Sequence, residues 1–199
     1  MTKQTNATNT IDRTFSDLIS LLPLFKKQCG DQINTAAELL VKAFSRGNKI
    51  LICGNGGSAA DSQHIAAEFV SSFSKLIKRR ALPAIALTVD TSIITACSND
   101  YSFDKIFERQ VEALGLAGDI LLVLSTSGES VNCLRAAEHA RRIGMQVIAL
   151  TKIDSKLCDH VDICITVPSE NTQYIQECHM IAYHLLVEIV ETQMFGEIK

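Results

Sequence analysis

The chain has 199 residues, of which 47% are hydrophobic and 21% charged, and its formal net charge is −3. This length and composition predict one globular domain over residues 11–199, after a flexible tail at 1–10. The slightly acidic balance disfavours nucleic acid as the main partner, and the short basic cluster at 75–80 is expected to be a solvated loop. The polar N-terminus and the lack of an apolar run near 18 residues argue against secretion and membrane insertion.

The cysteines are scattered, and no two of them have CxxC spacing. Several lie inside apolar runs, where a free cysteine behaves as a small hydrophobic residue. We therefore expect reduced thiols in a cytoplasmic protein. The cysteines are Cys29, Cys53, Cys97, Cys133, Cys158, Cys164 and Cys178.

Two helices are predicted before the first strand. Apolar residues recur at helical spacing over 11–29, where Pro23 is expected to kink or split the helix. A second apolar stripe covers 32–44 and ends before Gly47, a residue typical of helix ends.

The rest of the chain alternates between short apolar segments and amphipathic ones. The apolar segments predict strands at 49–53, 84–88, 119–124, 146–150 and 163–167. The intervening segments predict helices at 58–72, 90–97, 103–114, 130–143 and 171–194. Strands that are apolar throughout are buried on both faces, so we predict a doubly wound parallel sheet of α/β class, with helices on both sides.

A turn rich in hydroxyl groups follows the third predicted strand. Ser125, Thr126, Ser127 and Ser130 surround Gly128, directly before a helix. Free backbone N–H groups, hydroxyls and a helix N-terminus favour a bound anion, and the lack of a P-loop lysine disfavours a nucleoside triphosphate. The alternative is an ordinary helix cap, which needs only one hydroxyl.

A second polar turn, residues 54–58, ends the first predicted strand. Its glycines lack the full GxGxxG spacing, so a dinucleotide site is weakly supported. A polar substrate loop fits better, with Asn55 and Ser58 binding hydroxyl groups.

Two predicted helices carry groups suited to metal binding or proton transfer. His64 and Glu68 are four residues apart and face the same way. Gln176 and His184 are two turns apart on the last helix. These side chains could hold a divalent metal, or a glutamate and a histidine could act as base and acid. A surface hydrogen bond between His64 and Glu68, with His184 in the core, is the alternative.

Four segments together resemble the phosphoheptose isomerases of the sugar isomerase (SIS) domain family. They are residues 54–69, the Asn99-Asp100 pair, residues 125–130 and residues 176–184, and the resemblance extends from about residue 12 to 194.

The resemblance implies a flavodoxin-like subunit of a homotetramer, with N-terminal helices for oligomerisation and active sites at subunit interfaces. It also implies the conversion of sedoheptulose 7-phosphate to D-glycero-D-manno-heptose 7-phosphate, for ADP-heptose and lipopolysaccharide core synthesis in the cytoplasm.

The resemblance further implies a role for each matching residue. Glu68 and His184 would be catalytic base and acid, and zinc would be held by His64, Glu68, Gln176 and His184. The substrate would contact Asn55, Gly56, Gly57, Ser58, Asn99, Asp100, Ser125, Thr126, Ser127, Ser130 and Gln176.

Three positions depart from the family pattern. Glu129 stands where asparagine is common, Tyr174 where an arginine is frequent, and Ser155-Lys156 where the family often has two glycines. An inward-pointing Glu129 would weaken phosphate binding, whereas an outward-pointing one would change nothing.

Two other functions fit the resemblance. One branch of the family is a tetrameric scaffold that binds the bacterial replication initiator, and residues 82–90 and 109–128 look as close to that branch. Retention of the complete His/Glu set favours the enzyme. The second alternative is an SIS protein that acts on, or senses, another sugar phosphate.

Overall fold

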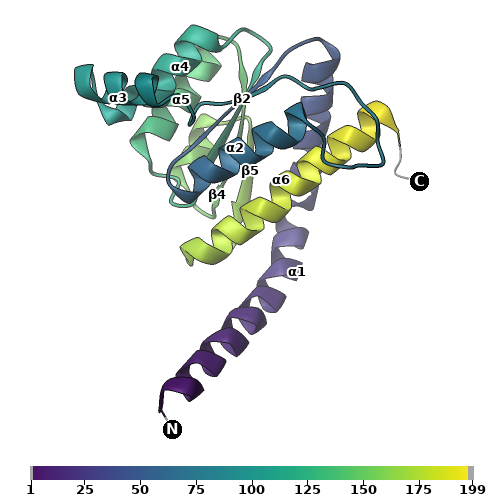
Figure 1. Cartoon of the computed structure of the whole chain (residues 1–199), viewed down its shortest axis with the longest axis vertical. Coiled ribbons are helices and arrows are strands. Elements are labelled where there is room, and N and C mark those ends of the chain that lie inside the picture. Colours follow the sequence, from purple (N-terminus) through teal and green to yellow (C-terminus); the bar gives the residue numbers. More distant parts are fainter. Residues whose placement is uncertain (1, 197–199) are drawn as a thin grey trace.

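The computed structural model describes residues 2–196, and their side chains from residue 7 onward. Helix α1 (Thr2–Ser45) is continuous, although a tail at 1–10 and two separate helices were predicted. Pro23 lies inside it without ending it. The buried stripe of α1 continues on both sides of the proline, through Leu21 before it and Phe25 after it, so that packing outweighs the lost hydrogen bond. The N-terminal half of α1 projects away from the body of the molecule (Figure 1).

A five-stranded, all-parallel sheet forms the centre of the domain, as predicted. The strands are β1 (Ile50–Gly54), β2 (Ala84–Ala86), β3 (Ile120–Ser125), β4 (Gln146–Lys152) and β5 (Ile163–Val167). Their order is β2-β1-β3-β4-β5, the flavodoxin-like arrangement. The chain reverses direction across the sheet between β1 and β3, where such folds bind ligands outside the carboxyl ends of the strands.

Helices cover both faces of the sheet (Figure 1). They are α2 (Gly57–Val70), α3 (Thr91–Asp100), α4 (Ile106–Leu114), α5 (Val131–Arg142) and α6 (Thr172–Phe195). Two short 3-10 helices, η1 (Phe103–Lys105) and η2 (Lys156–His160), complete the chain, and η2 was not predicted. In the described part of the chain, every helix is too short or too polar to cross a bilayer.

Alternate residues of each central strand face opposite layers. Ile50 and Ile52 pack in a core with α1, α2 and α6, whereas Leu51 and Cys53 pack in a second core with α4 and α5. Burial on both faces explains why β1 and β3 are apolar at nearly every position. The helices α2 and α6 therefore lie on the same face of the sheet, where they contact each other.

The prediction that all cysteines are reduced is wrong for one pair. Cys158 and Cys164 form a disulfide, with their Cα atoms 5.4 Å apart. CxxC spacing is not required, because η2 turns the chain back onto β5 and brings residues six apart into contact. The other five cysteines are free and buried, as predicted.

This pairing predicts a thiol count. In denaturant without reductant, we expect five reactive thiols per chain, and all seven cysteines after reduction. A thiol-specific chromogenic reagent measures both values. In a Cys158→Ser variant, every remaining thiol should react with or without reductant. Seven reactive thiols in unreduced wild-type protein would contradict the disulfide.

Burial also affects a histidine outside the His/Glu set. His179 on α6 is fully buried, and among the described residues neither ring nitrogen has a hydrogen-bond partner of good geometry. Burial lowers the pKa of His179 to about 4, an effect that the backbone of Thr151 offsets only in part. The residue is therefore neutral in the folded protein at pH 7.

The depressed pKa predicts a pH dependence of stability. The unfolded chain takes up a proton at His179 near pH 6.5, whereas the folded chain does so only near pH 4. Stability is therefore complete above about pH 6.5 and falls as the pH drops toward 4, by up to about 3 kcal/mol. Urea unfolding across this range should show a shallower pH dependence in His179→Leu than in wild type. Equal slopes in the two proteins would exclude His179 as the cause.

Candidate active site

The two polar turns leave neighbouring strands at the same edge of the sheet. Gly54 of β1 lies opposite Leu124 of β3, so residues 54–58 and residues 125–130 begin side by side. The sequence predicted both turns, and the sheet order brings them together.

The turn at 125–130 is folded by its own hydroxyl groups. The Ser125 hydroxyl accepts a hydrogen bond from the Gly128 N–H at 3.1 Å, and the Ser127 hydroxyl accepts one from the Glu129 N–H at 3.2 Å. Ser130 occupies the N-cap of α5 but makes no side-chain capping bond. Ser130 therefore does not act as an ordinary side-chain helix cap, and its hydroxyl can bind an anion instead.

Gly128 is required where the turn meets the next loop. Its φ is +66°, and a Cβ atom there would lie 1.7 Å from the Ser155 hydroxyl oxygen and 2.7 Å from that of Thr151. Thr151 and Ser155 are themselves hydrogen-bonded at 3.0 Å. The loop after β4 thus packs directly against the turn and fixes its shape.

The loop at 54–58 is held from both sides. Asn55 and Asn132 of α5 exchange two side-chain hydrogen bonds, of 2.9 and 2.8 Å, which tie the loop to the helix that follows the 125–130 turn. Gly57 lies against Gln176, because a Cβ atom there would come within 2.5 Å of its amide. Gly56 has a φ of +57°, and Ser58 is buried. Sequence reasoning missed Asn132, whose partner is 77 residues away.

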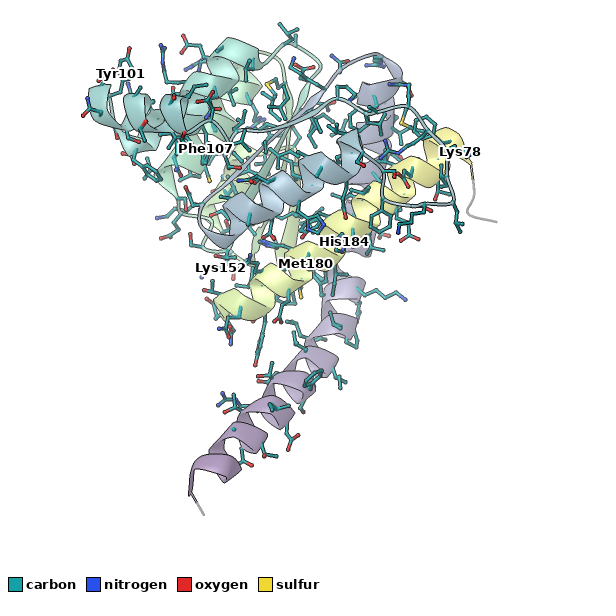
Figure 2. All side chains as sticks on the ribbon, viewed as in Figure 1. Lys78, Tyr101, Phe107, Lys152, Met180 and His184 are labelled. Atoms are coloured by element: carbon teal, nitrogen blue, oxygen red, sulfur yellow. A yellow bond between two sulfur atoms is a disulfide. The ribbon has the colours of Figure 1, made fainter. Side chains whose placement is uncertain are left out.

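The helices α2 and α6 bring three of the four predicted metal ligands together. Glu68 Oε1 lies 3.1 Å from His64 Nε2 and 3.6 Å from His184 Nε2. One ligand atom from each of the three residues lies within 4.8 Å of the others. Figure 2 shows His184 on α6, beside α2. His184 is therefore at the site and not in the core.

A tyrosine and an aspartate, both missed from the sequence, orient this cluster. The Tyr183 hydroxyl is paired with His64 Nδ1 at 3.3 Å, which leaves His64 Nε2 facing Glu68. Asp61 is buried and lies 3.5 Å from the same hydroxyl. Burial raises the pKa of Asp61, and hydrogen bonds from Gln176 and Tyr183 offset the rise in part. Because Asp61 precedes His64 and Glu68 by three and seven residues, its helical spacing was a signal that could have been used.

Gln176 lies beside the cluster, on the side of the 54–58 loop. Its amide donates a 2.8 Å hydrogen bond to Asp61 and contacts Gly57. Its side chain thus connects the loop to the face of α2 that carries His64 and Glu68.

The donor set suits a divalent metal ion. Glu68 Oε2 is buried and has no hydrogen-bond partner among the described residues. A buried carboxylate oxygen without a partner is costly unless a ligand or proton satisfies it. Two imidazole nitrogens and a carboxylate oxygen at close range form a donor set that zinc prefers.

Two predicted substrate contacts lie apart from the others. Asn99 and Asp100 end α3, and both are exposed and hydrogen-bonded to each other at 2.8 Å. Among the described residues, no hydrogen bond or ion pair joins them to the two turns or the His/Glu cluster. Tyr101, which follows them, lies at the outer end of α3, far from His184 (Figure 2).

Tyr174, one of the three departures, connects two helices. Its hydroxyl donates a 3.1 Å hydrogen bond to Asp17 on the projecting part of α1. The residue therefore ties the first turn of α6 to α1.

Comparison with known proteins agrees with this architecture. The family model for the SIS domain matches residues 15–152. Over 162 residues, the chain is 54% identical to the phosphoheptose isomerase of Roseiflexus sp. (strain RS-1), a match that covers 81% of each protein. The structure of a phosphoheptose isomerase from Francisella tularensis is similar, with a TM-score of 0.90 and 39% identity over 94% of this chain and 98% of that one. The corresponding values for the Neisseria gonorrhoeae enzyme are 0.88 and 39% over 94% and 99%.

The fold and the matched domain define the class: the chain is an SIS-domain protein, with polar turns at the carboxyl ends of β1 and β3. Within that class it belongs to the phosphoheptose isomerase family, because the chain is similar to members of that family along most of their length.

Proposed function

We propose that the protein interconverts sedoheptulose 7-phosphate and D-glycero-D-manno-heptose 7-phosphate, for ADP-heptose and lipopolysaccharide core synthesis. The observation that carries the proposal is the placement of Glu68 between two histidines, 3.1 Å from His64 and 3.6 Å from His184. A carboxylate next to an imidazole can move protons between neighbouring carbon and oxygen atoms near neutral pH.

Isomerisation transfers one proton between adjacent carbons. Glu68 removes a proton from C1 of the ketose, while His184 protonates the carbonyl oxygen at C2, which gives an enediol. Glu68 then returns the proton to C2, and His184 takes the hydroxyl proton at O1, which leaves the aldehyde. No net proton is gained or lost, so the same two groups serve both directions.

The remaining predicted residues hold the substrate in register. Ser125, Thr126, Ser127 and Ser130 bind the phosphate, far from the reacting carbons. Asn55, Gly56, Gly57, Ser58 and Gln176 contact the sugar. Asn99 and Asp100, which lie apart from these groups within one chain, would contact it across a subunit interface of the proposed tetramer. Binding energy from the remote phosphate is then available to orient C1 and C2 against Glu68.

The proposal includes one zinc ion per subunit, held by His64, Glu68, Gln176 and His184. When bound, zinc would polarise the substrate carbonyl as a Lewis acid. The unpartnered Glu68 Oε2 supports such a site. Metal analysis of the purified protein is expected to give about one zinc per chain, and much less after His64→Ala substitution.

We also propose a cytoplasmic homotetramer assembled through α1 and α6. Exposed apolar residues on α1, Ile11, Phe15 and Ile19, follow helical spacing and lead toward an apolar groove between α1 and α6. The groove is lined mainly by Leu22, Phe25, Ile33, Ile181, Leu185 and Ile189. Light scattering on the purified chain tests the assembly. Five of the seven cysteines are free and buried, which is typical of a reducing compartment, and the Cys158–Cys164 disulfide is the exception.

The decisive experiment is a turnover assay. Purified protein with zinc should convert sedoheptulose 7-phosphate in an assay coupled to heptose consumption. Turnover no higher than that of the Glu68→Gln and His184→Ala variants would refute the isomerase function. Nothing in the described residues or in the relatives named above favours the scaffold that binds the replication initiator.

A further inference from the structure

The turn at residues 125–130, which we propose binds the phosphate, contains one charged side chain. That charge is negative, like the charge of the ligand. Residues 125–130 provide hydroxyls, backbone N–H groups and a helix N-terminus, but Glu129 adds a carboxylate. A phosphate monoester is a dianion near neutral pH, and an uncompensated carboxylate beside it weakens binding.

In the structure, Glu129 points toward a lysine from the adjacent loop. Its Oε1 atom lies 3.3 Å from Lys156 Nζ, and the two side chains are 61% and 70% exposed. Exposed ion pairs contribute little to folding stability, so this pair has no strong structural purpose. The two departures from the family pattern that carry a charge thus contact each other.

The backbone places Lys156 firmly at the edge of the turn. Its neighbour Ser155 is buried and fills the space above Gly128. The Ser155 hydroxyl also accepts a 3.1 Å hydrogen bond from the Leu157 N–H, which fixes the start of η2 on both sides of Lys156. The loop that carries the lysine is therefore packed against the turn, whereas the Lys156 side chain itself is exposed.

The other lysine near this edge is engaged elsewhere. Lys152, labelled in Figure 2, donates a 2.8 Å hydrogen bond to Glu170, just before α6. Lys156 is thus the cation that pairs with the turn itself.

We propose that Lys156 is a further substrate-binding residue, which contacts the phosphate of the sugar while Glu129 holds its ammonium group at the turn. An ammonium group has three donors, so one can remain on Glu129 while another reaches a phosphate oxygen. The identity of the phosphorylated sugar rests on the proposed function. That the site binds an anion through Lys156 rests on the position of this lysine at the edge of the turn.

Four variants test the proposal: Lys156→Met, Glu129→Gln, the double variant, and Lys75→Met as a control at an exposed lysine after α2. We expect Lys156→Met to raise the KM for sedoheptulose 7-phosphate about tenfold, with kcat within about twofold of wild type. The control should match wild type.

The double variant distinguishes a Lys156 that contacts the phosphate from one that only neutralises the Glu129 carboxylate. If Lys156 contacts the phosphate, the double variant binds more tightly than Lys156→Met, because the repulsive carboxylate is gone, but more weakly than wild type. Full recovery in the double variant would overturn the contact, and so would an unchanged KM in Lys156→Met.

A binding measurement makes the test independent of turnover. Calorimetric titration with inorganic phosphate should show the same order of affinities among the variants. If wild type binds phosphate in a Lys156-dependent way but has no turnover, the proposed function fails and this inference stands. If turnover is present but phosphate affinity is equal in all variants, only this inference fails.

Discussion

Replacement of Glu68 by glutamine is expected to lower kcat about 10³-fold, which corresponds to about 4 kcal/mol of transition-state stabilisation. Glutamine keeps the shape of the side chain but cannot accept the substrate proton. Its neutral amide also removes the charge that attracts His64 and His184, both within 3.6 Å of Glu68 Oε1. The coupled heptose assay measures the loss, and it should appear in kcat rather than in KM.

The fold should survive this change. Within the part of the chain that the structure describes, Glu68 Oε2 has no hydrogen-bond partner to lose, and Oε1 faces His64 and His184 rather than the apolar core. In metal-free protein, circular dichroism and thermal unfolding are therefore expected to match wild type. Glu188→Gln, an isosteric change at an exposed position of α6, is the matched control and should keep full activity. A Glu68→Gln enzyme with more than about a tenth of wild-type kcat would show that another group is the base.

The sheet was predictable because its three central strands, β1, β3 and β4, are buried on both faces. The predicted segment 119–124 is apolar from Ile120 onward and has no helical periodicity, and the structure places β3 within one residue of that prediction. The polar turns after β1 and β3 were equally visible, since parallel strands carry their ligand-binding loops at the carboxyl ends.

The support of the site was harder to predict, since it depends on contacts between distant residues. In the sequence, nothing distinguishes Asn132 from the other polar residues of α5, and only the folded sheet places it against Asn55. Tyr183 likewise has the spacing of a core aromatic residue, and only the packing of α6 against α2 brings its hydroxyl to His64. Neither partner is close in sequence, so local spacing carries no signal of the contact.

For the basic cluster at 75–80, the prediction was too uniform, because all of its charged side chains were expected to be solvated. Lys75, Lys78 and Arg80 are exposed, but the Arg79 side chain is completely buried in an ion pair with Glu191 of α6. Composition cannot distinguish one member of a basic run from its neighbours. The distinction depends on an acidic partner 112 residues away.

The buried pair of Arg79 and Glu191 joins the two helices that carry the His/Glu cluster. Arg79 donates to the backbone carbonyl groups of Glu68 and Phe69, at 2.6 and 2.8 Å, and so satisfies the last turn of α2. Glu191 accepts hydrogen bonds from the Phe73 and Ser74 N–H groups, at 2.8 and 3.0 Å. Burial alone would raise the pKa of Glu191, but these bonds and the Arg79 guanidinium hold it below its usual value.

Replacement of Arg79 by methionine should therefore destabilise the protein by about 3–5 kcal/mol, because it leaves the Glu191 carboxylate buried without its cation. Urea unfolding near pH 7 measures the loss. The stability of Arg79→Lys should lie between that of Arg79→Met and that of wild type. Lysine restores the charge, but it lacks the planar guanidinium group that reaches Glu191 and the two carbonyl groups together. Since the folded-state pKa of Glu191 is depressed, its contribution is complete at neutral pH and is lost as the pH falls through that value.

Arg80→Met is the matched control, since it removes the same charge one residue along the chain from an exposed side chain. Its stability should stay within about 0.5 kcal/mol of wild type. The double variant Arg79→Met/Glu191→Met should lose less than the sum of the two single changes, because each single change leaves a buried group without its partner. Equal stability of Arg79→Met and Arg80→Met would mean that the pair is solvated, and that the alignment of α2 with α6 rests on apolar packing alone.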